Sequence, residues 1–186
     1  MRRLRWYHDR DASEQIDNLL SSAGEIGCLR VEFPAGGDGS RVPWMSLEPW
    51  TRSRAVTVAV VGSGEIASPA LEVALCSDLV YLRPKVVLRL STSPAPPSDG
   101  VIWALGRSGR AALARGLLET RDLDPTEAVV LGLATAVVAA DGPLPIPDDA
   151  SVASLTAARD LMRASAHGSS GLALELASFR LLFAAG

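Results

Sequence analysis

Residues 55–82 read AVTVAVVGSGEIASPALEVALCSDLVYL, and this stretch decides the fold. Residues 55–61 form an apolar, mostly β-branched run, which is typical of a strand buried on both faces. A glycine-containing break at residues 62–64 follows. Ser68-Pro69 then predicts a helix start, with Ser at the N-cap and Pro at the first helical position. We expect a short helix at residues 70–76 and a second strand at residues 79–82. The N-terminus of such a helix carries unpaired N–H groups that can hold an oxyanion or a phosphate.

Length and composition indicate one domain with a sizeable core. The chain has 186 residues, 48% of them apolar, and a net charge of −3, which argues against nucleic acid as a partner. Cys28 and Cys76 lie in apolar segments and predict buried, reduced thiols in an intracellular protein. No signal-peptide pattern opens the sequence, and the longest near-apolar run, residues 128–140, is too short for a membrane helix. We therefore expect a cytoplasmic protein with no membrane partner.

The rest of the chain predicts alternating strands and helices. Ile16, Leu19 and Leu20 recur at helical spacing within residues 11–23, and residues 28–33 alternate apolar and charged side chains as a half-exposed strand does. Further expected elements are short strands at 4–7 and 134–139, a turn at 34–39, a strand at 86–90, a helix starting at 101–105 and a helix at 111–118. Residues 41–54 show no clear period.

The second half of the sequence contains the clearest helix-capping signal. Asp124-Pro125-Thr126-Glu127 places Asp at an N-cap and Glu at the third helical position, close to a capping box, and Gly132 is expected to end that helix. We divide the chain into a core at residues 1–140, a linker at 141–150 and a helical segment at 151–186. In the last segment Leu172, Leu176, Phe179 and Phe183 form one apolar stripe at helical spacing.

These motifs resemble those of the crotonase (enoyl-CoA hydratase/isomerase) superfamily. Ser63-Gly64 stands at the family's turn, Ser68-Pro69-Ala70 replaces its glycine-rich helix start, and Leu71-Glu72-Val73-Ala74 and Cys76-Ser77-Asp78-Leu79 match the segments that follow. Residues 107–138 and 173–183 resemble later parts of the family, so that the likeness covers roughly residues 25–183. The Pro-Ala-Leu-Glu variant is most similar to the hydratase-like component of the dihydroxyphenylglycine pathway.

The resemblance implies an α/β crotonase (ClpP-like) fold of repeated ββα units, with C-terminal helices used for trimerisation. It also implies an acyl thioester substrate whose enolate oxygen is held by two backbone N–H groups. One N–H would come from Ala35 or Gly36. The other falls at Pro69, which has no N–H, so that Ala70 is the neighbouring alternative.

Glu72 matches the first catalytic glutamate of the hydratases. Without the resemblance, the same residue reads as a first-turn glutamate stabilised by the helix dipole. The family's second glutamate would fall near Thr92, which could hold a water molecule. Trp44 and Trp50 could line an acyl pocket, or cover a core or a subunit contact. Gly64 and Ser68 complete the expected substrate site.

Two functional hypotheses follow from these residues. The first is an enzyme of a specialised-metabolite pathway that dehydrates, hydrates or decarboxylates an acyl-CoA or carrier-protein thioester. It would need no metal and no cofactor beyond the coenzyme A or phosphopantetheine of its substrate, and it would form a homo-trimer or hexamer, or a hetero-oligomer with a related enzyme. The second is a non-catalytic subunit that binds and stabilises a partner enzyme. Whether Glu72 faces an open cavity or is packed away discriminates between them.

Overall fold

The computed structural model describes residues 2–23, 27–90, 97–109 and 122–146, together with residues 151, 153, 154, 156, 157, 159 and 160. Two sheets organise these residues: a parallel five-stranded sheet of order β1-β2-β3-β5-β8 and a three-stranded sheet of order β4-β6-β7. The strands are β1 (Arg2–Arg5), β2 (Cys28–Phe33), β3 (Val56–Val61), β4 (Gly64–Ile66), β5 (Leu79–Leu82), β6 (Val86–Arg89), β7 (Asp122–Leu123) and β8 (Ala136–Val137). The helices are α1 (Ala12–Ala23), α2 (Trp44–Thr51), α3 (Ala70–Leu75), α4 (Asp99–Ser108) and α6 (Pro125–Val130).

The chain repeats a ββα unit that divides its two strands between the two sheets. β3, β4 and α3 form one unit, and β5, β6 and α4 form the next. β2 is followed by an isolated parallel bridge between Gly36 and Ile66 and then by α2, so that it forms a shorter version of the same unit. The predicted arrangement of repeated ββα units is therefore confirmed.

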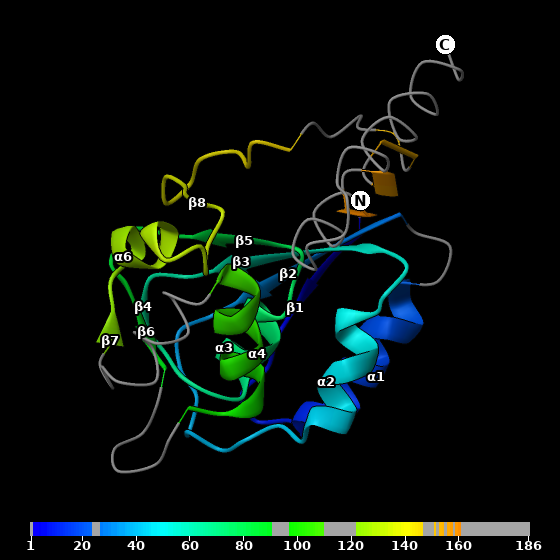
Figure 1. The fold of residues 1–186 in the computed structure, drawn as a ribbon, viewed down its shortest axis with the longest axis horizontal. Helices are drawn as coiled ribbons and strands as arrows, with labels where there is room; N and C mark the ends of the chain where they lie inside the picture. The colour runs from blue at the N-terminus through cyan, green and yellow to red at the C-terminus, as the bar shows by residue number, and fades with distance from the viewer. Residues whose placement is uncertain are drawn as a thin grey trace.

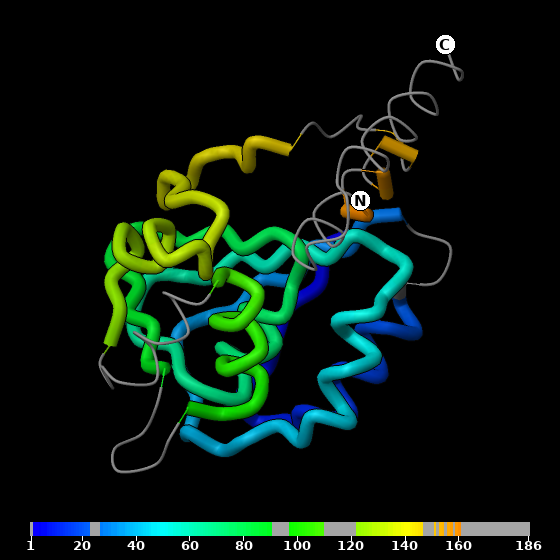
Figure 2. The backbone as a smooth tube through the Cα atoms, in the orientation of Figure 1, coloured from blue at the N-terminus to red at the C-terminus, as the bar shows by residue number. Residues whose placement is uncertain are grey.

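The helices α1, α2, α3 and α4 lie on one side of the five-stranded sheet. Figure 1 shows α3 and α4 in front of the strands, and Figure 2 shows α1 and α2 running side by side next to them. The main core lies between these helices and the sheet, where β2 and β3 contribute Leu29, Val31, Phe33, Ala59 and Val61. The opposite face of β3 carries Val56, Val58 and Val60, which pack with Leu144 and Ile146. β3 is buried on both faces, as its β-branched run predicts.

Most strand predictions are confirmed by the structure. β2 and β5 have the expected bounds, and β3 and β6 differ from the expected ranges by one residue. The capping box is also confirmed: the Asp124 carboxylate accepts from the Glu127 N–H at 2.8 Å, and Glu127 accepts from the Asp124 N–H at 3.3 Å. Gly132 follows α6 with φ +74, as expected for a glycine after a helix end.

Three local predictions are wrong. The break expected at residues 62–64 overlaps β4, because Gly64 at φ +110 turns the chain directly into the second sheet. Residues 41–54 contain α2, although Pro49 lies inside that helix. The predicted cap of α3 also differs: the helix begins at Ala70, as expected, but Pro69 lies at the N-cap position instead of the first helical position, and no side chain caps the helix. The predicted helix at 111–118 and the stripe from Leu172 to Phe183 lie outside the described residues.

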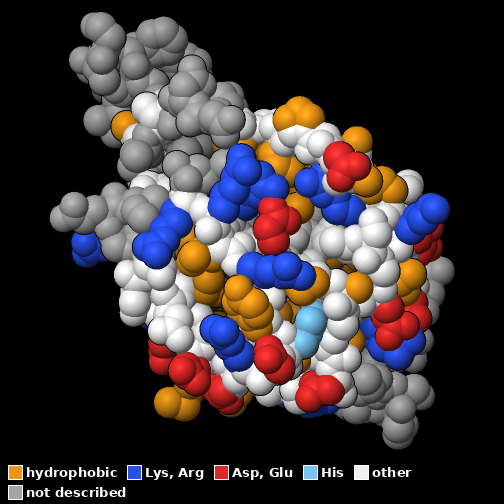
Figure 3. Space-filling model, turned by 180° about the vertical axis from the view of Figure 1, so that it is seen from behind, with side chains coloured by type: hydrophobic (Ala, Val, Ile, Leu, Met, Phe, Trp, Pro, Cys, Tyr) orange, Lys and Arg blue, Asp and Glu red, His pale blue; other side chains and the backbone are white. Residues whose placement is uncertain are grey.

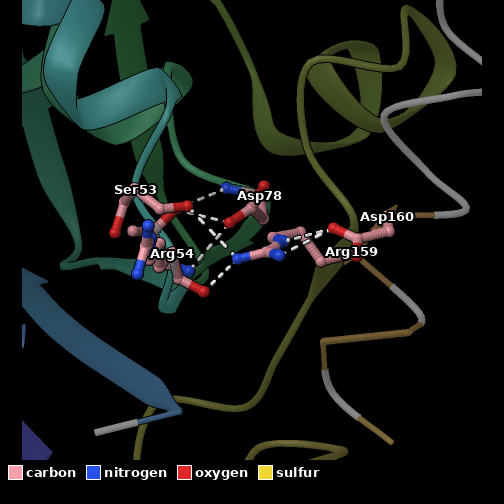
Figure 4. A network of polar contacts seen from close by, with 6 residues as sticks. Ser53, Arg54, Asp78, Arg159 and Asp160 are labelled. Carbon is pink, nitrogen blue, oxygen red and sulfur yellow. Dashed lines mark hydrogen bonds and ion pairs between the residues drawn. The ribbon is translucent and has the colours of Figure 1, made fainter. Parts of the chain in front are cut away.

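A buried arginine connects the C-terminal segment to the start of β3. The Arg159 guanidinium donates to the carbonyl of Ser53 at 3.2 Å and to that of Arg54, and it pairs with Asp160 at 2.7 Å (Figure 4). In the same region the Asp78 carboxylate accepts from both the backbone N–H and the hydroxyl of Thr57 at 2.9 Å, which ties β3 to the beginning of β5.

The charged side chains are interspersed on the surface. The face opposite to that of Figure 1 carries basic and acidic side chains among apolar ones, and neither positive nor negative charge gathers in one large area of it (Figure 3). Among the described residues, none of the helices is long and apolar enough to cross a membrane.

Candidate active site

Glu72 lies in the first turn of α3 and is completely buried, with 0% of its surface exposed. Its Oε1 accepts a hydrogen bond from the Val42 N–H at 3.3 Å, just before α2. Its Oε2 is buried without a hydrogen-bond partner among the described residues. Glu72 is therefore packed between three segments of the chain.

Gly100, at the start of α4, makes this packing possible. A Cβ at this position would lie 3.0 Å from Glu72 Oε2, 3.0 Å from Glu72 Cβ and 2.9 Å from Leu47 Cδ1. Only glycine lets α4 approach the carboxyl group so closely. Because the N-terminal end of a helix carries unpaired N–H groups, this approach places the carboxyl group beside favourable donors.

The surroundings of Glu72 raise its pKa above the ordinary glutamate value, chiefly because burial disfavours the charged form. The hydroxyls of Ser68 and Ser98 and the N–H groups of Val42 and Gly100 act in the opposite direction, since each favours the carboxylate. Burial has the larger effect. A carboxyl group whose pKa moves toward neutrality is suited to general acid–base chemistry.

Ser98 was missed by the sequence reasoning and lies beside Glu72. It occupies the N-cap of α4, but its hydroxyl does not cap that helix, and its Oγ is buried without a hydrogen-bond partner among the described residues. The N-cap preference for serine predicts a bond to its own helix. No local signal shows that the hydroxyl instead favours the ionised form of a carboxyl group on another helix.

The backbone donors expected for an oxyanion differ in their availability. The Gly36 N–H is engaged, because it donates to the Glu65 carbonyl at 2.7 Å. Pro69 has no N–H, and its position before α3 is as the sequence implies. The N–H groups of Ala35, after β2, and Ala70, the first residue of α3, are the other two that the resemblance names.

The two tryptophans have different environments. Trp50 is in the core, and its indole N–H donates to Ser77 Oγ at 3.3 Å. Trp44 is half-buried and faces Trp103 of α4, with ring centroids 6.0 Å apart. The core alternative therefore describes Trp50, whereas Trp44 lies at the contact between α2 and α4.

The other predicted site residues are placed as follows. Ser68 is buried next to Glu72, and Gly64 lies at the start of β4, where a Cβ would be 2.8 Å from Ala35 Cβ. Thr92 lies outside the described residues. Within the part of the chain that the structure describes, no group of three His, Cys, Asp or Glu side chains could hold a metal ion.

Neither the comparison with protein-family models nor that with curated proteins finds a match. Solved structures do match. An enoyl-CoA hydratase/isomerase from Cupriavidus metallidurans CH34 is 18% identical, with a TM-score of 0.66 over 96% of this chain and 80% of that one. An enoyl-CoA hydratase/isomerase family protein from Silicibacter pomeroyi is 16% identical, with a TM-score of 0.67 over 92% of this chain and 86% of that one. The chain therefore has the crotonase fold.

The same fold also occurs with other chemistry. The 1510-N membrane-bound stomatin-specific protease matches with a TM-score of 0.55 and 16% identity, over 73% of this chain and 74% of that one. The fold alone does not choose between a thioester enzyme and other activities, so that the choice depends on the residues of the site.

Proposed function

We propose that this chain is a cytoplasmic crotonase-like enzyme that acts on an acyl-CoA or carrier-protein thioester in a specialised-metabolite pathway. The observation that carries the proposal is Glu72: a buried carboxyl group with a raised pKa and one oxygen without a partner. Buried polar atoms without partners are rare in native proteins, and they concentrate at functional sites.

The proposed reaction passes through an enolate. Glu72 takes a proton from the carbon next to the thioester carbonyl, and backbone N–H groups hold the oxygen on which negative charge develops. Ala35, in the segment after β2, and Ala70, at the start of α3, supply these two N–H groups. A single carboxyl group suffices for dehydration, decarboxylation or isomerisation.

A second function is favoured by a different observation. Glu72 is entirely covered by its own chain, and Pro69 removes the donor that crotonases use at that position. In a non-catalytic subunit that stabilises a partner enzyme, the carboxyl group would serve only to join α3, α4 and the segment before α2. The same contacts would then be structural.

The experiment that tests the proposal is proton exchange in D₂O. The purified protein is incubated with a panel of saturated, unsaturated and 3-hydroxyacyl thioesters, and deuterium incorporation next to the carbonyl is measured by mass spectrometry. We expect incorporation with at least one thioester and none with the E72Q variant. If no thioester exchanges, and a tagged chain co-purifies with a stoichiometric crotonase-like partner, the subunit function is the correct one.

A further inference from the structure

We propose that His8 is a positioning residue of this site. Its imidazole N–H holds the carbonyl of the Pro34–Ala35 peptide group, which fixes the direction of the N–H at the other end of that group and makes it a stronger donor to the substrate oxygen. This inference rests on the proposed function, in which the Ala35 N–H holds the enolate oxygen. His8 acts through the backbone and does not touch the substrate.

The first observation is a hydrogen bond from a side chain to this peptide group. His8 Nε2 lies 3.1 Å from the carbonyl oxygen of Pro34. Because a carbonyl oxygen only accepts, the proton of this bond belongs to Nε2. In a planar trans peptide group the C=O and the N–H point in opposite directions. The imidazole therefore lies at one end of the peptide dipole, and an acceptor of the Ala35 N–H would lie at the other.

The second observation concerns the backbone on either side of this peptide group. The Phe33 carbonyl accepts from the Gly62 N–H at 2.8 Å. The Gly36 N–H donates to the Glu65 carbonyl at 2.7 Å. The Pro34–Ala35 group lies between these two backbone anchors, and its carbonyl bonds instead to a side chain. The orientation of the group thus depends on His8 as well as on the neighbouring backbone.

The third observation is that His8 is itself held in place. Gln15 of α1 is only 7% exposed, and its side-chain amide bonds both polar groups of the preceding residue. Gln15 Oε1 accepts from the Tyr7 N–H at 2.8 Å, and Nε2 donates to the Tyr7 carbonyl at 2.8 Å. On the other side of the ring, a Cβ at Gly36 would lie 2.9 Å from His8 Nε2, so that glycine leaves room for the imidazole. The turn between β1 and α1 therefore presents the ring to the segment after β2.

The chemical effect follows from polarisation of the amide. A hydrogen bond accepted by the carbonyl draws electron density from the amide nitrogen, and the N–H becomes a stronger donor. This gain is largest toward an acceptor that carries negative charge, which the enolate oxygen does only as the proton leaves C2. Loss of the His8 bond should therefore lower kcat more than it raises KM.

Two variants of the full-length protein test the bond. H8L and H8Q both remove the ring and are similar in length, but only H8Q keeps a side-chain N–H. With a thioester that wild type accepts, we expect H8L to lower kcat for exchange of the C2 proton with D₂O by roughly two- to tenfold, the effect of one hydrogen bond. H8Q should recover most of this loss. D9N, at an exposed position of the same turn, is the control and should leave the rate unchanged.

A spectroscopic readout needs no substrate. A bond accepted by the Pro34 carbonyl moves the amide ¹⁵N resonance of Ala35 downfield, so that this resonance should lie upfield in H8L relative to H8Q. Identical Ala35 resonances in H8L and H8Q would overturn the bond, whatever the activity.

The exchange rates separate this role from the proposed function. Equal kcat for H8L and wild type, or no recovery in H8Q, would overturn the role of His8 and leave the proposed function standing. Absence of exchange in wild type with every thioester would overturn the proposed function and this role with it.

Discussion

Replacing Glu72 by Gln tests whether the carboxyl group is held in a buried site, because Gln keeps the size of the side chain and removes its titration. Burial raises the pKa of Glu72 in the folded protein, whereas the unfolded chain has the ordinary value. Below that ordinary value both states are protonated, and the contribution of Glu72 to stability is fully present. As the pH rises from there to the folded-state pKa, the unfolded state releases its proton first, and wild type loses stability.

The size of this loss follows from one proton. In that pH window the free energy of unfolding of wild type, taken relative to E72Q, should fall by up to about 1.4 kcal/mol per pH unit, and it should be level on either side. Urea denaturation of both proteins over a series of pH values measures the difference directly. E14Q, at an exposed glutamate of α1, serves as the matched control for the loss of one carboxylate. A level difference for E72Q as well would refute the buried, raised-pKa description of Glu72.

The same variant tests the chemistry. With a thioester that wild type accepts, E72Q should lower turnover by at least about 10²-fold, the low end for a general acid–base group. Equal turnover in a correctly folded variant would assign Glu72 to a structural role and favour the partner-subunit function.

Four further outcomes are expected. G100A should destabilise the protein by about 1–3 kcal/mol, since its Cβ would lie within 3.0 Å of Leu47 and Glu72. G106A in the same helix, where nothing lies within 4 Å of the added Cβ, should stabilise the protein by roughly 0.5–1 kcal/mol. Thermal or urea unfolding of both variants measures the difference. Burial raises the pKa of Cys76 to about 12, so that a thiol reagent at pH 8 should label it only after denaturant is added. P69G supplies an N–H at the helix start and should raise or preserve turnover if an oxyanion is held there; loss of turnover without unfolding would contradict that geometry. Light scattering at micromolar concentration should show a trimer, a hexamer or a complex with a related enzyme, and a monomer would contradict the predicted assembly.

The sequence was informative where local pattern and burial agree. β2 and β5 are short apolar or alternating runs with turn-forming residues on both sides, and both have their predicted bounds. The capping box at Asp124 was also predictable, because all of its contacts lie within four residues. α2 was not predictable from its period, since it combines Pro49 with the buried Leu47 and Trp50 in only 8 residues.

The site was predictable only in part, because its contacts are long-range. Glu72 was identified through the resemblance of residues 71–79 to the crotonases, whereas its position in a first helical turn alone favours a dipole-stabilised glutamate. The approach of Val42 and Gly100 buries it. Ser98 carries an ordinary N-cap signal, which does not reveal that its hydroxyl makes no capping bond. The engagement of the Gly36 N–H depends on a bridge to the second sheet, which residues 34–39 alone do not reveal.

The convergence of three segments on Glu72 also bears on the order in which the molecule folds. The Val42 N–H that bonds the carboxyl group lies 30 residues away in the sequence, and α4 comes from the other direction. The carboxyl group stays hydrated until both segments have docked, so that proton uptake belongs to this late docking step and not to early formation of the sheets. Raising the pH should therefore loosen the packing of α2 and α4 around α3 first, while the parallel strands, which do not involve Glu72, keep their pairing.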